Sequence, residues 1–307
     1  MSTNIKLRGI IPPIGTPLTP DERVDIAGLR RLVSYLLGAG VDALFVNGTM
    51  GIFALLSDTE QLRAVETVVD EVSGRVPVIA GVSDTGTKRV IEKAKQVESM
   101  GVDYLTALPP FYYLLTQESC IRFYRDVAQA VAKPLFIYNN LTFTKFNLSL
   151  DSIVSLSDEP NIAGIKETNP DCGRWSQLTN TVGQREEFSV LIGTEILPHV
   201  ALMLGAEGIV AGSHNIAAGI AVELYRAMKA KNFSLAMQLG ERLRRVNKIF
   251  EYGEIWGAFE VALSYLGIGE KATAGPYHSV DQEERAHIEM ILQDCGIRRD
   301  HISFGAT

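Results

Sequence analysis

The sequence has little of what marks secreted, membrane or nucleic-acid-binding proteins. Its 307 residues include three cysteines, Cys120, Cys172 and Cys295, which form no CxxC pair. An odd number of widely spaced cysteines argues against a disulfide framework or a cysteine zinc site, and it is typical of a reducing cytoplasm. No uninterrupted apolar run approaches the roughly 20 residues of a membrane span. The net charge of −7 also leaves no reason to expect a nucleic-acid or membrane partner.

Motifs for the commonest cofactor and metal chemistries are also missing. The five histidines lack the HxH or HxxxH spacing of a metal site. No glycine-rich dinucleotide fingerprint follows the first strand, where Pro12, Pro13 and Pro17 are found instead. No GxSxG nucleophile elbow is present. We therefore expect no metal, nicotinamide or serine-hydrolase mechanism, and no cofactor.

What the chain does contain is a regular alternation of short apolar runs and longer amphipathic segments. Each short run is apolar throughout, which is typical of a parallel strand covered on both faces. The eight predicted strands are residues 9–14, 43–47, 76–82, 104–108, 134–139, 162–166, 189–193 and 208–212. Helical patterns lie between them at 25–37, 58–72, 87–100, 117–131 and 149–157. This alternation predicts an α/β protein with a (β/α)8 TIM barrel.

Only helical patterns follow the last predicted strand, at 217–230, 233–250, 257–266 and 282–295. We expect residues 1–231 to form the barrel with the catalytic site, and residues 232–307 to form a C-terminal helical extension. A repeated joint supports the barrel, because Gly-Val-Asp at 40–42 and 101–103 and Gly-Ala-Glu at 205–207 each lie between a helix and a strand. A glycine there can adopt the left-handed conformation that ends a helix.

Polar residues at the carboxyl ends of the strands are candidates for the active site, which forms at that face of such a barrel. Lys166 follows an apolar run, so we expect its side chain at the rim of the apolar interior, where it could form a Schiff base. A solvated lysine, or one paired with Glu167, fits the same pattern. Tyr138 ends the neighbouring strand and could shuttle protons, or simply pack its ring there.

A tight turn flanked by glycines, Gly48-Thr49-Met50-Gly51, follows the second predicted strand. Its backbone N–H groups and the Thr49 hydroxyl could hold a carboxylate. The alternative is a βα turn that needs glycine only for its backbone geometry.

Together these segments resemble the dihydrodipicolinate synthase / N-acetylneuraminate lyase family of pyruvate-dependent class I aldolases. The matching pieces are GIIPPIGTPLT at 9–19, GTMG at 48–51, YN at 138–139, GIKE at 164–167 and GIVAGSHN at 208–215. The resemblance implies a TIM barrel with a C-terminal helical extension, usually as a homotetramer built as a dimer of dimers. It further implies a cytoplasmic lyase that binds pyruvate or another 2-oxo acid, and in some reactions an aldehyde.

The resemblance also implies a catalytic role for four residues. Lys166 is implied as the Schiff-base lysine, and Tyr138 as the proton shuttle. Thr49 matches the hydroxyl of the proton relay. Tyr112 matches a relay tyrosine that in many members enters the site of the neighbouring subunit.

The residues implied to bind substrate include two departures from the family pattern. Gly48 belongs to the carboxylate-binding turn, Val210 matches an apolar residue beside pyruvate, and Glu195 lies where lyases hold hydroxyls of the second substrate. Met50 replaces a hydroxyl residue of the turn, and Phe143 stands where dihydrodipicolinate synthases have an arginine. We therefore expect intact imine chemistry, a more apolar second-substrate pocket, and a protein that is not an authentic dihydrodipicolinate synthase.

Three hypotheses about function follow from the sequence. The first is a lyase that works through an imine, by aldol cleavage, aldol addition or dehydration of a 2-keto-3-deoxy sugar acid. The second is a phosphosugar isomerase or epimerase that binds phosphate at the turn after the eighth strand, which leaves Lys166 and Tyr138 unexplained. The third is a barrel that binds 2-oxo acids without turnover, because Met50 disturbs the turn.

Overall fold

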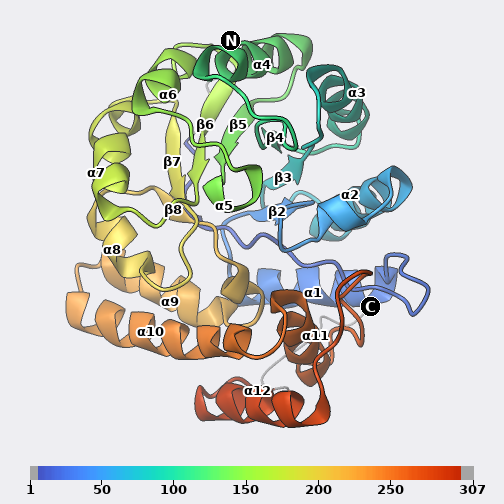
Figure 1. Cartoon of the computed structure of the whole chain (residues 1–307). Helices are drawn as coiled ribbons and strands as arrows, with labels where there is room; N and C mark the ends of the chain where they lie inside the picture. The colour runs from blue at the N-terminus through green and yellow to red at the C-terminus, as the bar shows by residue number, and fades with distance from the viewer. Residues whose placement is uncertain (1–5, 299–307) are drawn as a thin grey trace.

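The computed structural model describes residues 6–298 and confirms the (β/α)8 barrel (Figure 1). All strand pairs are parallel, in the sheet order β1-β8-β7-β6-β5-β4-β3-β2. The strands are β1 (Gly9–Ile10), β2 (Leu44–Val46), β3 (Val78–Gly81), β4 (Tyr104–Ala107), β5 (Leu135–Asn139), β6 (Ile162–Glu167), β7 (Ser189–Ile192) and β8 (Gly208–Ile209). Each lies in a segment that the sequence predicts as a strand.

β1 is shorter than predicted, because Pro12 and Pro13 have no N–H to donate to a ladder. The barrel still closes at this seam. The Phe45 N–H donates to the Pro12 carbonyl at 3.0 Å, and the Ile14 N–H donates to the Phe45 carbonyl at 2.8 Å. Two hydrogen bonds beyond the end of β1 therefore join the first and last strands of the sheet order.

Helices surround the strands (Figure 1). Those confirmed from the sequence are α1 (Ile26–Ala39), α2 (Asp58–Val72), α3 (Thr87–Glu98), α4 (Gln117–Ala130), α6 (Leu150–Leu156), α9 (Ala218–Lys229), α10 (Phe233–Val246), α11 (Ile255–Tyr265) and α12 (Gln282–Asp294). The sequence did not predict α5 (Leu141–Thr144), α7 (Cys172–Asn180) and α8 (Pro198–Met203). α5 and α8 are too short to show a clear helical repeat, and α7 buries only two large apolar side chains, Trp175 and Leu178. Among residues 6–298, no helix has the length and apolar character that a membrane crossing requires.

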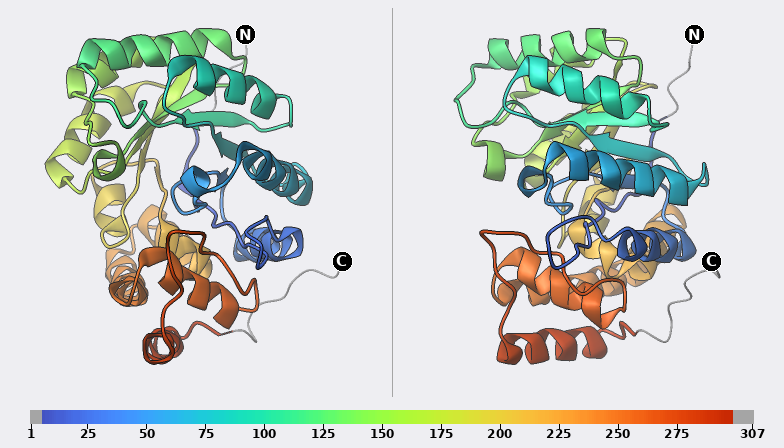
Figure 2. Two further views of the ribbon diagram at one scale, coloured as in Figure 1. Left: turned by 45° about the vertical axis from the view of Figure 1, so that its right-hand side comes forward. Right: turned by 90° about the vertical axis from the view of Figure 1, so that its right-hand side faces the viewer.

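The helices α10, α11 and α12 gather on one side of the barrel, as Figure 2 shows. The predicted division at residues 231 and 232 falls just before α10. The division into a barrel, residues 1–231, and a C-terminal helical extension, residues 232–307, of one continuous unit stays a prediction.

The three repeated joints are confirmed, and their acidic residues have a function that the sequence did not reveal. Gly40, Gly101 and Gly205 have φ angles of 82°, 91° and 100°, in the left-handed region. The acidic side chain two positions later accepts a hydrogen bond from a strand segment beside it: Asp42 from Ile10 at 2.7 Å, Asp103 from Val78 at 2.8 Å and Glu207 from Val190 at 2.8 Å. Each joint thus ends a helix and ties neighbouring strands together.

Candidate active site

An irregularity in β6 directs Lys166 into the barrel. Leu135 pairs with Ile162 but Phe136 pairs with Gly164, so β6 has one residue more than β5 at this point. An extra residue moves every later side chain to the opposite face of the strand. Uninterrupted alternation would put Lys166 on the same face as Ile162, which packs against the helices. The bulge instead turns the lysine toward the interior.

The Lys166 ammonium lies against two aromatic rings. Its Nζ is 4.0 Å from the ring centroid of Tyr138 and 5.2 Å from that of Phe45, and the residue is only 6% exposed. No carboxylate of the described chain lies within ion-pair distance of this ammonium. A desolvated amine without a fixed counter-ion is well placed to attack a carbonyl carbon.

Glu167, the alternative partner for Lys166, is fully buried and paired elsewhere. Its carboxylate accepts a hydrogen bond from Arg174 Nε at 2.7 Å and from Asn139 Nδ2 at 2.9 Å. This buried ion pair leaves Lys166 free, so the hypothesis of a Lys166–Glu167 pair is wrong.

The phenol of Tyr138 connects the lysine with the turn after β2. Its hydroxyl is 3.0 Å from Thr49 Oγ1 and accepts a hydrogen bond from Asn140 Nδ2 at 3.3 Å. Burial alone would raise the pKa of Tyr138, but the Lys166 charge and the hydrogen bonds to Lys166, Thr49 and Asn140 lower it below its ordinary value. A phenol that gives up its proton readily, beside an amine and a second hydroxyl, is suited to shuttling protons.

The first glycine of the turn is needed for packing. A Cβ on Gly48 would lie 2.9 Å from the Phe45 ring, so close packing and not a left-handed backbone favours glycine at this position. The N–H groups of Thr49 and Met50 meanwhile have no hydrogen-bond partner in the part of the chain that the structure describes. Two free N–H groups beside the Thr49 hydroxyl provide donors for a carboxylate.

Glu195 is committed to the loop that follows β8. Its carboxylate accepts hydrogen bonds from Gly212 N at 2.5 Å, Ser213 N at 3.0 Å and Ser213 Oγ at 2.7 Å. These are the N–H groups that the phosphosugar hypothesis needs for phosphate, and the protein's own carboxylate already occupies them. The geometry therefore disfavours that hypothesis, while contact between Glu195 and substrate hydroxyls stays a prediction.

Of the remaining predicted residues, Val210 is buried in the barrel interior and Tyr112 is exposed. Val210 is 3% exposed and belongs to the same interior apolar cluster as Tyr138. Tyr112 is 86% exposed, has a φ of 90° that is unfavourable for a non-glycine residue, and packs edge-on against Tyr113. No hydrogen bond joins Tyr112 to Thr49 among the described residues. Its role in the site of a neighbouring subunit stays a prediction.

An apolar pocket of about 210 Å³ adjoins the glycine-flanked turn after β2, here called the relay turn. Its lining comprises Thr49, Ile52, Phe53, Ala54, Leu55, Leu108, Phe111, Phe143, Thr144, Trp256 and Tyr277. Sequence reasoning identified Phe143 but missed Trp256 and Tyr277, which come from α11 and the loop after it. Their distance along the chain from the strand ends left no signal that could have found them.

Thr168 is another residue that sequence reasoning missed. Its hydroxyl is buried and lacks a hydrogen-bond partner in the described chain. A Cβ on Gly193 would lie 3.1 Å from that hydroxyl and 3.3 Å from Lys166 Cε. The Thr168 hydroxyl and the Lys166 side chain thus approach the same glycine. The sequence signal that could have identified Thr168 is its position two residues after Lys166.

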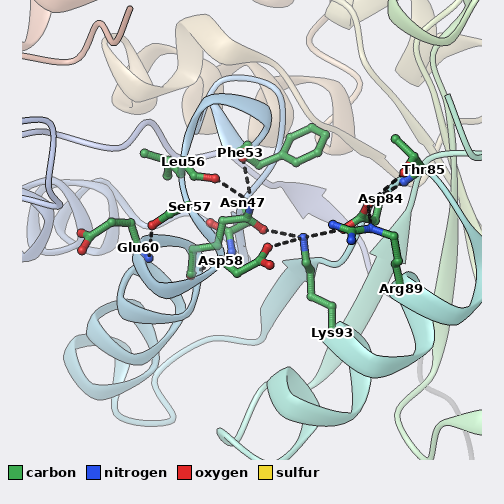
Figure 3. Close-up of polar contacts among 11 residues, drawn as sticks. Asn47, Phe53, Leu56, Ser57, Asp58, Glu60, Asp84, Thr85, Arg89 and Lys93 are labelled. Carbon is green, nitrogen blue, oxygen red and sulfur yellow. Dashed lines mark hydrogen bonds and ion pairs between the residues drawn. The ribbon is translucent and has the colours of Figure 1, made fainter. Parts of the chain in front are cut away.

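A separate polar cavity of about 120 Å³ lies between α2 and α3 (Figure 3). Lys93 reaches into it and forms ion pairs with Asp58 at 3.1 Å and Asp84 at 3.3 Å. Arg89 donates to Asp84 at 2.6 Å. Burial opposes ionisation of Asp84, but these cations and the Thr85 N–H lower its pKa to about 2. The charges of this cavity are matched within the protein.

This lowered pKa makes a testable contribution to stability. Because the pKa of Asp84 is lower in the folded protein, its stabilisation is present above the unfolded value of 3.8 and is lost as pH falls through that value toward 2. We expect the stability difference between wild type and Asp84→Asn to shrink by about 1 kcal/mol from pH 6 to pH 3. Urea unfolding of both proteins at both pH values measures this. An unchanged difference would contradict the ion-pair assignment.

Comparisons with known proteins agree with this architecture. Residues 6–295 match the model of the dihydrodipicolinate synthetase family. An uncharacterized DapA-like lyase of Halobacterium salinarum is 32% identical over 95% of each chain. The probable 2-dehydro-3-deoxy-D-pentonate aldolase YjhH of Escherichia coli K12 is 30% identical over 80% of this chain and 82% of that protein.

A solved structure shows the same likeness in three dimensions. YagE, a prophage protein of E. coli K12 from the dihydrodipicolinic acid synthase family, was crystallised in complex with pyruvate. It is 28% identical, with a TM-score of 0.90, and the match covers 94% of this chain and 99% of that one. From its sequence and its barrel alike, the chain belongs to the dihydrodipicolinate synthetase family.

Proposed function

We propose that this lyase acts on pyruvate or another 2-oxo acid through a Schiff base at Lys166. The observation that carries the proposal is the contact of the unpaired Lys166 ammonium with Tyr138, whose hydroxyl bonds to Thr49. The pyruvate bound to YagE and the aldolase name of YjhH support the same chemistry. The family name refers to a synthase, so membership does not choose between synthesis and cleavage.

We propose a role for each group of the site. The free N–H groups of Thr49 and Met50 hold the 2-oxo acid carboxylate. Once the Lys166 ammonium has lost a proton, its amine attacks the keto carbon, and loss of water leaves an iminium ion. Tyr138 carries protons to and from the carbinolamine oxygen, with Thr49 as the next hydroxyl of the relay. The iminium draws electrons from the neighbouring C–C bond, which can then break to give an enamine, or form by the reverse step.

Borohydride trapping tests this proposal. We expect incubation with pyruvate and borohydride to add one pyruvate-derived group per chain, on the peptide that contains Lys166. An absent adduct would favour the phosphosugar hypothesis. An adduct without turnover on any aldehyde or 2-keto-3-deoxy acid would favour the hypothesis of a binding protein.

The pocket beside Thr49 makes authentic dihydrodipicolinate synthase activity unexpected. Aspartate semialdehyde carries a carboxylate that needs a cationic partner in a desolvated pocket. Phe143 lines this pocket, and none of the lining residues is charged. We expect kcat/KM for pyruvate plus aspartate semialdehyde to stay below about 10⁴ M⁻¹s⁻¹, a low value for a natural substrate. Coupled condensation assays measure it, and an efficient reaction would show that another cation, such as Lys145, replaces the missing arginine.

We also propose that Tyr112 completes the relay of a neighbouring copy within a homotetramer. Its exposure and its unfavourable φ support a role that only an assembly uses. Tyr112→Phe and Lys166→Ala should each be nearly inactive. When the two variants are co-assembled at random in equal amounts, half of the subunit pairs contain one copy of each variant. In such a mixed pair one of the two sites has both an intact Lys166 and an intact neighbouring Tyr112, so the mixture should regain about a quarter of wild-type activity. A mixture as inactive as its parents would place Tyr112 outside the neighbour's site.

A further inference from the structure

The apolar pocket beside the relay turn is a continuation of the catalytic site. Thr49 lines the pocket, and its hydroxyl lies 3.0 Å from that of Tyr138. The pocket and the Tyr138 hydroxyl therefore meet at a single side chain, that of Thr49. The pocket is the natural place for the part of the substrate that is not the 2-oxo acid.

The walls of the pocket are aromatic and lack charge. Phe53 and Phe111 pack edge-to-face with centroids 6.3 Å apart, and Trp256 and Tyr277 lie 4.5 Å apart. Phe143 is 49% exposed although it is a large apolar side chain. The aromatic side chains can pack against the ring of a substrate either stacked or edge-to-face. A carboxylate or a chain of hydroxyls would lose water here without gaining enough partners.

The size of the pocket limits what it can hold. A dry cavity of about 150 Å³ lined by aliphatic and aromatic residues holds one benzene molecule. The pocket here measures about 210 Å³, which leaves room for one six-membered ring with a small substituent.

We propose that the second substrate, or the leaving aldehyde, is a single-ring aromatic aldehyde whose ring packs among Phe53, Phe111 and Phe143. This inference rests on the proposed Schiff-base function. In cleavage, the bond between C3 and C4 of a 4-aryl-4-hydroxy-2-oxo acid breaks, and its electron pair forms the enamine on Lys166. The C4 hydroxyl gives its proton to Tyr138 and becomes the aldehyde oxygen. Addition is the reverse, and no oxidant or reductant is needed.

Condensation of pyruvate with three aldehydes tests the preference. We expect benzaldehyde to react with a kcat/KM about tenfold or more above that of glyceraldehyde, and about threefold above that of cyclohexanecarbaldehyde. The last aldehyde matches the ring in size but has no π system. Equal or faster reaction of glyceraldehyde would overturn the proposal, and equal reaction of cyclohexanecarbaldehyde would overturn its aromatic part.

The aldehydes also differ in intrinsic reactivity. Comparing a variant with wild type cancels this difference, because both proteins react with the same aldehydes. Phe143→Arg should lower the ratio of kcat/KM for benzaldehyde to that for glyceraldehyde by about tenfold, because it puts a charge at the pocket. Met290→Arg is the matched control, since Met290 is 52% exposed on α12 and outside the pocket lining; its ratio should match wild type. A ratio unchanged in Phe143→Arg would show that the ring does not enter the pocket.

Borohydride trapping with pyruvate accompanies each assay. Intact trapping without an aryl preference refutes this inference alone, whereas absent trapping in wild type refutes the Schiff-base function as well.

Discussion

Lys166→Ala is expected to abolish turnover and pyruvate trapping while the protein remains folded. Among residues 6–298 this amine is the group placed to form the imine, so its loss should lower kcat by about 10⁵-fold or more, as removal of a covalent nucleophile does elsewhere. The fold should survive because the substitution removes a desolvated cation that has no ion-pair partner in the described chain. Mass spectrometry after borohydride reduction and circular dichroism measure the two outcomes.

Lys145→Ala is the matched control for this experiment. Lys145 is an exposed lysine near the same face, whose Nζ donates only to the Thr142 carbonyl. Trapping should be the same as in wild type in this variant. Trapping at wild-type stoichiometry in Lys166→Ala would mean that another lysine is the nucleophile, and the assignment of the site would be wrong.

Tyr138→Phe is expected to keep the ring and remove the proton shuttle. The phenyl group still packs against Phe45, whose ring lies 6.0 Å from that of Tyr138. Turnover should fall by about 10²–10⁴-fold, the usual contribution of general acid–base catalysis. Because the Tyr138 pKa is lowered in the folded protein, any limb of the wild-type pH–rate profile that reports the phenol should disappear.

Thr49→Val helps to separate a relay from simple packing. It removes the hydroxyl that bonds to Tyr138 and keeps a side chain of similar volume. If the two hydroxyls act as one relay, the double variant should lose little more activity than Tyr138→Phe alone. Turnover of Tyr138→Phe within about threefold of wild type would make the tyrosine structural.

The sequence was sufficient for the barrel because its signals are local. Continuous apolar runs, amphipathic repeats and three Gly-x-acid joints each act over a few residues, and parallel connectivity then places all strand carboxyl ends at one face. Lys166, Tyr138 and Thr49 could be predicted as neighbours for that reason. α8 could not be predicted because its six residues contain too few turns for a repeat, and α7 because it buries only two large apolar side chains.

The sequence by itself thus determined the fold class, the family and the residues at the reacting end of the barrel. Only the tertiary structure decided how those residues are used. The bulge in β6 turns Lys166 inward, and it depends on a register with β5 that no local pattern reports. Likewise Trp256 lines a pocket beside Thr49 although about two hundred residues of chain separate the two. The packing of the C-terminal helices against the barrel brings them together, and sequence spacing does not report such packing.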